Sequence, residues 1–416
     1  MAATVTAPAA PRRPVSRGVG VPVAVIVGLV AVYLVAARAG GALPAFWVVG
    51  LAFGFIVQRS RLCFTSAFRD LFLMGQGRTM RGILVGLGVA TLGFSMIMST
   101  IIPNPGAGFL PNDAHILPLG IATVAGGLMF GFGMVVAGGC VSGALYRMGE
   151  GYVASWVAIA GVMIGLYGLN RTWNWWWDRS ISTDAFVWLP TDLGYGSSIA
   201  LTIVALAASY LGVLWWERRA SGNMPSIPIK RREPPPPTTV GDDVRVIGRR
   251  IFRQEWSPLT GAVALALLNV LLFIRYRPLG VVGEVSRWSS DIADRLGAGV
   301  GTLKGLDGLA GCAPVLAEGA SWFTDAFMLN TGIIAGSFTA AILAREFRIR
   351  APRSPRRYLQ SLGGGVIMGY GAGLGLGCTI GAFFSAVPSL ALNGWVYAVA
   401  LAGGAYLGVQ VIRRFP

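Results

Sequence analysis

The chain has 416 residues, of which 54% are hydrophobic and only 12% are charged, and its mean hydropathy is +0.63. Soluble globular proteins carry roughly 25% charged residues, so the composition excludes a soluble fold and favours a membrane protein. The net charge of +16 would suit nucleic-acid binding. Arginine also collects in the cytoplasmic loops of membrane proteins, and we therefore expect a lipid bilayer and no nucleic acid as the partner.

Ten apolar segments follow one another along the chain. They are closer in length to the roughly 20 residues of a membrane helix than to the roughly ten alternating residues of a barrel strand. Because several are short or glycine-rich, we expect some of the helices to be broken or re-entrant. The segments lie near residues 21–38, 44–57, 82–102, 118–138, 153–169, 197–216, 257–274, 327–344, 359–377 and 393–412.

Arginine placement predicts how these helices are oriented. Arginines cluster in residues 59–81, 217–256 and 345–357. The positive-inside rule assigns all three clusters to the cytoplasm. Residues 103–118 carry no Lys or Arg, and the loop around Trp175 is nearly neutral, so both are expected outside. This arrangement predicts that both termini are cytoplasmic.

A proline-rich stretch divides the chain into two membrane halves. Residues 217–256 contain Pro234 to Pro237 and little apolar material, which is typical of an exposed, flexible linker. The basic N-terminal stretch lacks a convincing cleavage site, so we expect its helix to be retained. The predicted parts are a cytoplasmic tail at 1–20, a first membrane half at 21–216, the cytoplasmic linker at 217–256 and a second membrane half at 257–416.

The two halves match under a shift of 238 residues, which aligns Cys140 with Cys378. The arginine assignments direct the helix before Cys140 inward and the helix before Cys378 outward. We therefore predict an all-α fold with two pseudo-symmetric halves in an inverted-topology repeat, whose substrate site lies near the bilayer midplane. The same shift aligns four candidate pathway glycines, Gly139 with Gly377 and Gly143 with Gly381.

The glycines around these two cysteines allow a helix to break. A break exposes N–H groups whose partial positive charge can hold an anion, and a thiol at the break faces whatever occupies the gap. Cys63 lies at the end of another short apolar segment, beside a basic loop. The alternative is structural, because small residues form helix-packing faces and buried cysteine often acts as a small hydrophobic residue.

Charged residues close to the cysteines are candidates for a gate or an entry site. Arg147 and Glu150 follow Cys140, and Arg69 follows Cys63. Charges are costly in lipid, so we expect these side chains to face a cavity or each other. An interfacial salt bridge explains them equally well.

Several cofactor and enzyme classes are excluded. His115 is the single histidine, which excludes most histidine-based zinc sites, and we interpret it as a loop residue without a role. No P-loop motif occurs. We predict no metal and no cofactor. The absence of a C-x-x-C pair disfavours a membrane thiol enzyme that moves sulfane sulfur, although this alternative and a scaffold subunit stay open.

Three motifs contain the aligned cysteines and Cys63. They are Arg59-Ser60-Arg61-Leu62-Cys63-Phe64-Thr65-Ser66-Ala67-Phe68-Arg69-Asp70, Gly138-Gly139-Cys140-Val141-Ser142-Gly143-Ala144-Leu145-Tyr146-Arg147-Met148-Gly149-Glu150-Gly151, and Gly375-Leu376-Gly377-Cys378-Thr379-Ile380-Gly381. Together they resemble the YeeE/YedE sulfur-transport family.

The resemblance implies a bacterial inner-membrane protein that takes up thiosulfate through three essential cysteines, which match Cys63, Cys140 and Cys378. It also implies a small cytoplasmic partner, a sulfurtransferase-like protein of the TusA type. The chain is longer than typical thiosulfate members, and Cys312 matches none of the three motifs, although it is a further gate or entry candidate. A related sulfur or selenium species is therefore the alternative substrate.

Thiosulfate is a dianion with a soft terminal sulfur and three oxygens that accept hydrogen bonds. Helix N-termini suit the oxygens, and a neutral thiol offers a weak S–H donor to the sulfur. Weak contacts at successive sites permit passage without a trap. We therefore predict a transporter, not an enzyme, whose cysteines relay the anion as thiols, with a covalent persulfide relay as the alternative.

Overall fold

The computed structural model describes residues 20–111, 113–220, 251–299, 301–306 and 323–414. Its longer helices in chain order are α1 (Gly20–Ala39), α2 (Leu43–Ser60), α3 (Phe64–Met74), α4 (Arg78–Ile101), α5 (Ile121–Ala137), α6 (Val141–Gly149), α7 (Val153–Arg179), α8 (Leu189–Ala220), α10 (Pro258–Arg275), α11 (Val282–Arg295), α12 (Asp325–Leu343), α13 (Pro355–Leu374) and α14 (Leu392–Arg414). The short helices are η1 (Pro105–Ala107), η2 (Ile181–Thr183) and η4 (Thr379–Ser385), and β1 (Pro118–Leu119) pairs antiparallel with β2 (Ala185–Phe186).

Ten of these helices coincide with the ten predicted apolar segments: α1, α2, α4, α5, α7, α8, α10, α12, α13 and α14. Among the described residues, eight helical stretches are long and apolar enough to cross a membrane, and α13 with η4 forms a bent ninth. A helix satisfies its own backbone groups in lipid, which explains why the apolar segments are helical. The prediction of an all-α polytopic membrane protein is confirmed.

Three membrane helices are broken, as the short and glycine-rich segments predicted. Arg61, directly after α2, has a φ of 52°, and Gly138, directly after α5, has a φ of 82°. Near Leu376, where φ is 52°, the chain bends by 47° between α13 and η4. A left-handed residue cannot continue a right-handed helix. Each break therefore redirects the chain before a second, shorter helix begins.

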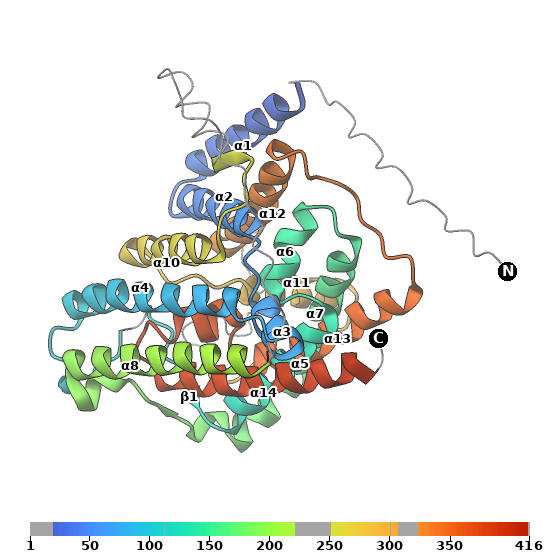
Figure 1. Cartoon of the computed structure of the whole chain (residues 1–416). Helices are drawn as coiled ribbons and strands as arrows, with labels where there is room; N and C mark the ends of the chain where they lie inside the picture. The colour runs from blue at the N-terminus through green and yellow to red at the C-terminus, as the bar shows by residue number, and fades with distance from the viewer. Residues whose placement is uncertain (1–19, 112, 221–250, 300, 307–322, 415–416) are drawn as a thin grey trace.

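The helices pair across the two halves of the chain. α2 packs along α12, α4 along α10, α5 along α13 and α14, and α7 along α13 (Figure 1). Glycine permits these close approaches, since a side chain at Gly54 or Gly165 would collide with the carbonyl oxygen of Ile333 or Val366. Small residues at helix contacts are typical of membrane bundles, where helix packing depends on close backbone approach.

In two regions between the membrane helices, the structure contains helical segments that the sequence did not predict. The stretch from Tyr276 to Asp325 contains α11, which packs against α7, α12 and α13. Its buried Glu284 and Arg287 form an ion pair, and hydrogen bonding to Glu284 raises the pKa of Arg287. Because α11 carries such polar residues, a hydropathy profile does not indicate a packed helix there.

The predicted linker begins inside α8, which continues to Ala220. Its central part, residues 221–250, lies outside the described residues. Its last residues lie against the end of α2, where the Trp256 N–H donates a hydrogen bond to the Arg59 carbonyl over 2.9 Å. The division into two membrane halves stays a prediction.

Candidate functional site

Three cysteines occupy the position directly before the short second helix at each break. Cys63 precedes α3, Cys140 precedes α6 and Cys378 precedes η4, each with an extended backbone. All three are free thiols and are at most 2% exposed. The first N–H groups of a helix have no partner inside the helix and carry a partial positive charge. The Cys63 and Cys140 thiols therefore lie at the positive ends of α3 and α6.

The cysteine-bearing breaks meet inside the protein. The Cys63 and Cys140 thiols lie within hydrogen-bonding reach of each other, and the Thr379 hydroxyl, next to Cys378 in the chain, lies beside the Cys140 thiol. The Gly143 N–H donates a hydrogen bond to the Cys140 sulfur over 3.3 Å. The tertiary structure thus brings the three predicted motifs together.

Gly143 lies against both thiols, where a larger residue would not fit easily. A Cβ atom at this position would lie 3.2 Å from the Cys140 sulfur and 3.5 Å from the Cys63 sulfur. Gly139 borders Arg147, whose Nη1 would lie 3.6 Å from a Cβ there. Near Cys378, a Cβ atom at Gly377 would lie only 2.8 Å from the Ala382 nitrogen, so the two backbones approach closely there. Gly381 lies buried within η4.

Two threonine hydroxyls beside the cysteines make no regular hydrogen bond within the described part of the chain. Thr65 and Thr379 are at most 1% exposed, and the Oγ1 atom of Thr379 has only the weakly bonding Cys140 thiol beside it among the described residues. An unpaired buried hydroxyl is costly unless a ligand satisfies it. Sequence reasoning missed both residues. Their only signal is position, because Thr65 follows Cys63 by two residues and Thr379 directly follows Cys378.

Arg147 supplies a positive charge to the same place. It lies on α6, donates a hydrogen bond from Nη1 to the Gly138 carbonyl, and brings Nη2 to 3.8 Å from the Cys63 sulfur. A cation beside the thiols and two helix N-termini together make the environment attractive to an anion. No ion pair joins Arg147 to Glu150, although the structure describes both side chains.

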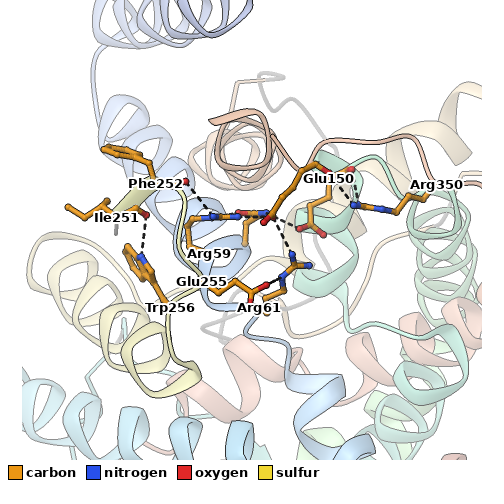
Figure 2. A network of polar contacts seen from close by, with 10 residues as sticks. Arg59, Arg61, Glu150, Ile251, Phe252, Glu255, Trp256 and Arg350 are labelled. Atoms are coloured by element: carbon orange, nitrogen blue, oxygen red, sulfur yellow. Dashed lines mark hydrogen bonds and ion pairs between the residues drawn. The ribbon is translucent and has the colours of Figure 1, made fainter. Parts of the chain in front are cut away.

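Glu150 belongs instead to a second cluster of charged and polar residues, which Figure 2 shows in close-up. Its Oε1 accepts a hydrogen bond from Gln58 over 3.2 Å, and Arg350 donates to its backbone carbonyl over 3.5 Å. Burial raises the pKa of Glu150, and the Gln58 hydrogen bond and neighbouring arginines oppose this shift. Sequence reasoning missed Gln58 in this cluster.

The other two gate candidates are Arg69 and Cys312. Arg69 forms a salt bridge of 2.9 Å with its neighbour Asp70 and has no described contact with the thiols, which matches the salt-bridge interpretation. Cys312 lies outside the described residues. Among the described residues, no group of three His, Cys, Asp or Glu side chains could hold a metal ion.

His115 lies in a loop, as expected, but the loop is packed inside the protein. The residue is 3% exposed, and its backbone N–H donates to the Ser389 hydroxyl over 3.3 Å. Neither ring nitrogen has a hydrogen-bond partner among the residues that the structure describes. Burial, with a smaller contribution from Arg277, lowers its pKa to about 4. The imidazole is therefore neutral near pH 7, and it lies in a different connection from the cysteines.

An apolar groove of about 620 Å³ lies between α2, α7 and α12. Trp47, Trp156 and Phe338 line it. It offers few polar donors, so it does not suit a hydrated anion. The cysteine site, by contrast, has polar features that suit an anion.

Comparison with known proteins points in the same direction. The family described as "Sulphur transport" matches residues 59–407. The chain is 28% identical over 362 residues to the thiosulfate transporter TsuA of Escherichia coli, and the aligned region covers 84% of this chain and 88% of that protein. It is 31% identical over 366 residues to the thiosulfate transporter TsuA of Spirochaeta thermophila, covering 85% of this chain and 93% of that protein.

Proposed function

Because this chain belongs to the sulfur-transport family, we propose that it takes up thiosulfate across the bacterial inner membrane through a pathway lined by Cys63, Cys140 and Cys378. Family membership confirms the resemblance seen in the motifs, and it identifies a multi-pass membrane transporter and not an enzyme. The convergence of three buried, cysteine-bearing helix breaks carries the proposal.

The substrate is thiosulfate because two relatives that cover most of the chain are named thiosulfate transporters. The chemistry of the cysteine site suits this anion. Its oxygens accept hydrogen bonds from the Thr65 and Thr379 hydroxyls and from the first N–H groups of α3 and α6, while its charge is balanced by Arg147. Its soft outer sulfur meets the thiols, which are weak donors.

The thiols act without forming a covalent bond to the substrate. In this relay the anion passes between successive S–H donors, and each contact is weak enough to be released. In the covalent alternative, a thiolate attacks the outer sulfur and forms an S–S bond, and sulfite leaves with the electron pair of the broken bond. Mass spectrometry of thiosulfate-treated protein separates the two. A stoichiometric mass increase of one sulfur on any of the three cysteines would contradict the non-covalent relay.

The two halves form an inverted repeat around this pathway. The shift that aligns Cys140 with Cys378 exchanges α5 with α13 and α7 with α14, and both resulting pairs, α5 with α14 and α13 with α7, are in contact. α5 and α13 also pack on each other in opposite directions, because Gly126 lies near Gly371 and Gly133 near Gly364. This reciprocal pairing supports the repeat.

The arginine-rich connections support a cytoplasmic location for both termini and the linker. The pathway then delivers the anion to the side of the membrane where a small TusA-like sulfurtransferase would receive its sulfur. Binding of such a protein to the membrane-embedded chain, measured by co-purification with and without thiosulfate, tests this partner separately from transport.

Uptake of radiolabelled thiosulfate into proteoliposomes tests the function. Wild-type protein is expected to take up thiosulfate, and Cys140→Ala to lose uptake at an unchanged protein level. Ser209→Ala is the matched control, because Ser209 on α8 bonds only within its own helix. Sulfate, selenite and tellurite serve as competitors. If unlabelled thiosulfate fails to compete while selenite succeeds, the proposed substrate is wrong and the transporter assignment stands.

A further inference from the structure

Two arginines at the end of α2 converge on a single carboxylate oxygen. The Nη2 atoms of Arg59 and Arg61 lie 2.8 Å and 3.2 Å from Oε2 of Glu346, and Gln58 Nε2 donates to the same oxygen over 3.0 Å. Figure 2 shows Arg59 and Arg61 in this cluster, with Glu255 against Arg61 and Glu150 on the side toward Arg350. Several charge-assisted donors aimed at one oxygen are the arrangement by which proteins bind oxyanions.

We propose that Arg59, Arg61 and Gln58 form a second oxyanion site, at the cytoplasmic end of the transport pathway, which the Glu346 carboxylate occupies when the pathway is closed. Glu346 is then a tethered substitute for the transported anion. The placement along a pathway rests on the proposed function, whereas the binding of an oxyanion by these donors does not.

Two of the three donors are held inside the protein, whereas the carboxylate lies nearer the surface. Arg59 and Gln58 are fully buried, and Arg59 Nε donates to Gln58 over 2.6 Å while Nη1 donates to the Phe252 carbonyl over 3.4 Å. The Glu346 side chain is 29% exposed and lies on the connection after α12, directly after Arg345 with its left-handed φ of 60°. The partly exposed carboxylate can leave while Arg59 and Gln58 stay in place.

A buried guanidinium without a counter-charge is strongly unfavourable. When the Glu346 carboxylate leaves, another anion must therefore take its place beside Arg59. The transported anion is the natural occupant, because it arrives from within the protein. Exchange of one anion for the other couples opening of this end to the presence of substrate.

Polar residues on two chain segments lie between this site and the thiols. Arg61 precedes Cys63 by two residues, and Arg147 lies 3.8 Å from the Cys63 sulfur. Further along α6 and its end, Glu150 accepts the Gln58 hydrogen bond. An anion that leaves Cys63 therefore next meets the Arg61 side chain, which is 47% exposed to solvent.

Guanidinium and amide donors recognise oxygen atoms and charge, not a soft sulfur. The second site is therefore expected to bind sulfate about as well as thiosulfate. Selection of the sulfur atom belongs to the cysteines, and the second site serves release.

Binding can be measured in a background that lacks the thiol site. We would purify the full-length chain with Cys63, Cys140 and Cys378 changed to Ala and titrate it with sodium thiosulfate and sodium sulfate by calorimetry. A site that is open in only a fraction of the molecules binds more weakly, in proportion to that fraction. If the Glu346 carboxylate leaves the site open in about one molecule in ten, Glu346→Gln is expected to lower the dissociation constant about tenfold. Adding Arg61→Gln is expected to abolish this gain, and adding Arg356→Gln, an exposed arginine on α13, to preserve it.

No gain of binding in Glu346→Gln, or a gain that survives Arg61→Gln, would overturn the second site. In the otherwise native chain, Arg61→Gln is expected to slow thiosulfate uptake several-fold relative to Arg356→Gln, and equal rates would also contradict the proposal. The outcomes are separable from the main function. If Cys140→Ala transports normally, the cysteine pathway fails while the binding result in the cysteine-free chain stands on its own.

Discussion

The Arg147 guanidinium lies 3.8 Å from the Cys63 sulfur, although the two residues are 84 positions apart in the chain. They come from different breaks, so this contact joins the N-terminus of α3 to the body of α6. It places a permanent positive charge beside two buried thiols. The pathway proposed for thiosulfate depends on this charge.

Arg147→Gln is therefore expected to lower uptake at low thiosulfate concentration. A hydrogen bond to a charged group contributes roughly 1.5–3 kcal/mol, which corresponds to a loss of about tenfold to a hundredfold. The effect should fall mainly on KM, and Arg147→Lys should recover part of it because the charge is kept. Uptake kinetics in proteoliposomes measure both, with the exposed Arg171→Gln as the control. An unchanged KM in Arg147→Gln would contradict the role of this charge.

Gly143→Ala is expected to block the pathway without unfolding the protein. The new Cβ would fill the space between two sulfur atoms, at 3.2 Å and 3.5 Å, and would not strike the backbone. Gly363→Ala on α13 is the matched control, since its Cβ would meet nothing within 4 Å. Alanine at that helix position should be tolerated or raise stability by up to about 1 kcal/mol. Normal uptake by Gly143→Ala, at the protein level of the control, would rule out a passage through this space.

Replacing the unpaired hydroxyls separates transport from stability. Thr65→Val and Thr379→Val remove a buried hydroxyl that makes no regular hydrogen bond with the described residues, so each is expected to keep or slightly raise the melting temperature. Uptake should fall in both, because the oxygens of the substrate lose a donor. Thr91→Val is the contrasting control, as the Thr91 hydroxyl donates to the Leu87 carbonyl. Normal transport in both variants would exclude these hydroxyls from the pathway.

His115 makes stability depend on pH. Its pKa of about 4 in the folded protein lies below the usual 6.5, so the unfolded chain takes up a proton first as the pH falls. The contribution is fully present above pH 6.5 and is lost between pH 6.5 and 4, by at most about 3 kcal/mol. His115→Leu, which removes no side-chain hydrogen bond, should show a flatter melting-temperature profile between pH 7.5 and 4.5 in detergent. Parallel profiles for the two proteins would show that His115 is not the titrating group.

The candidate site was only partly visible in the sequence. Cys63, Cys140 and Cys378 were found because each lies in a motif rich in small or polar residues. Thr65, Thr379, Gln58 and Glu346 were missed because a threonine, glutamine or glutamate near an arginine is common in any chain. Their significance depends on what they touch, and Gln58 touches Glu346 across 288 positions of sequence.

The sequence by itself determined the membrane class, the positions of ten helices and the family. These features are local, because lipid requires every apolar stretch to satisfy its own backbone hydrogen bonds as a helix. Only the tertiary structure decided that the breaks meet, that Arg147 faces Cys63, and that Glu346 contacts Arg59 and Arg61 at the end of α2. Such contacts depend on which helices pack together, and helix packing in lipid is set by small steric differences between distant segments. Hydropathy along the chain does not record those differences.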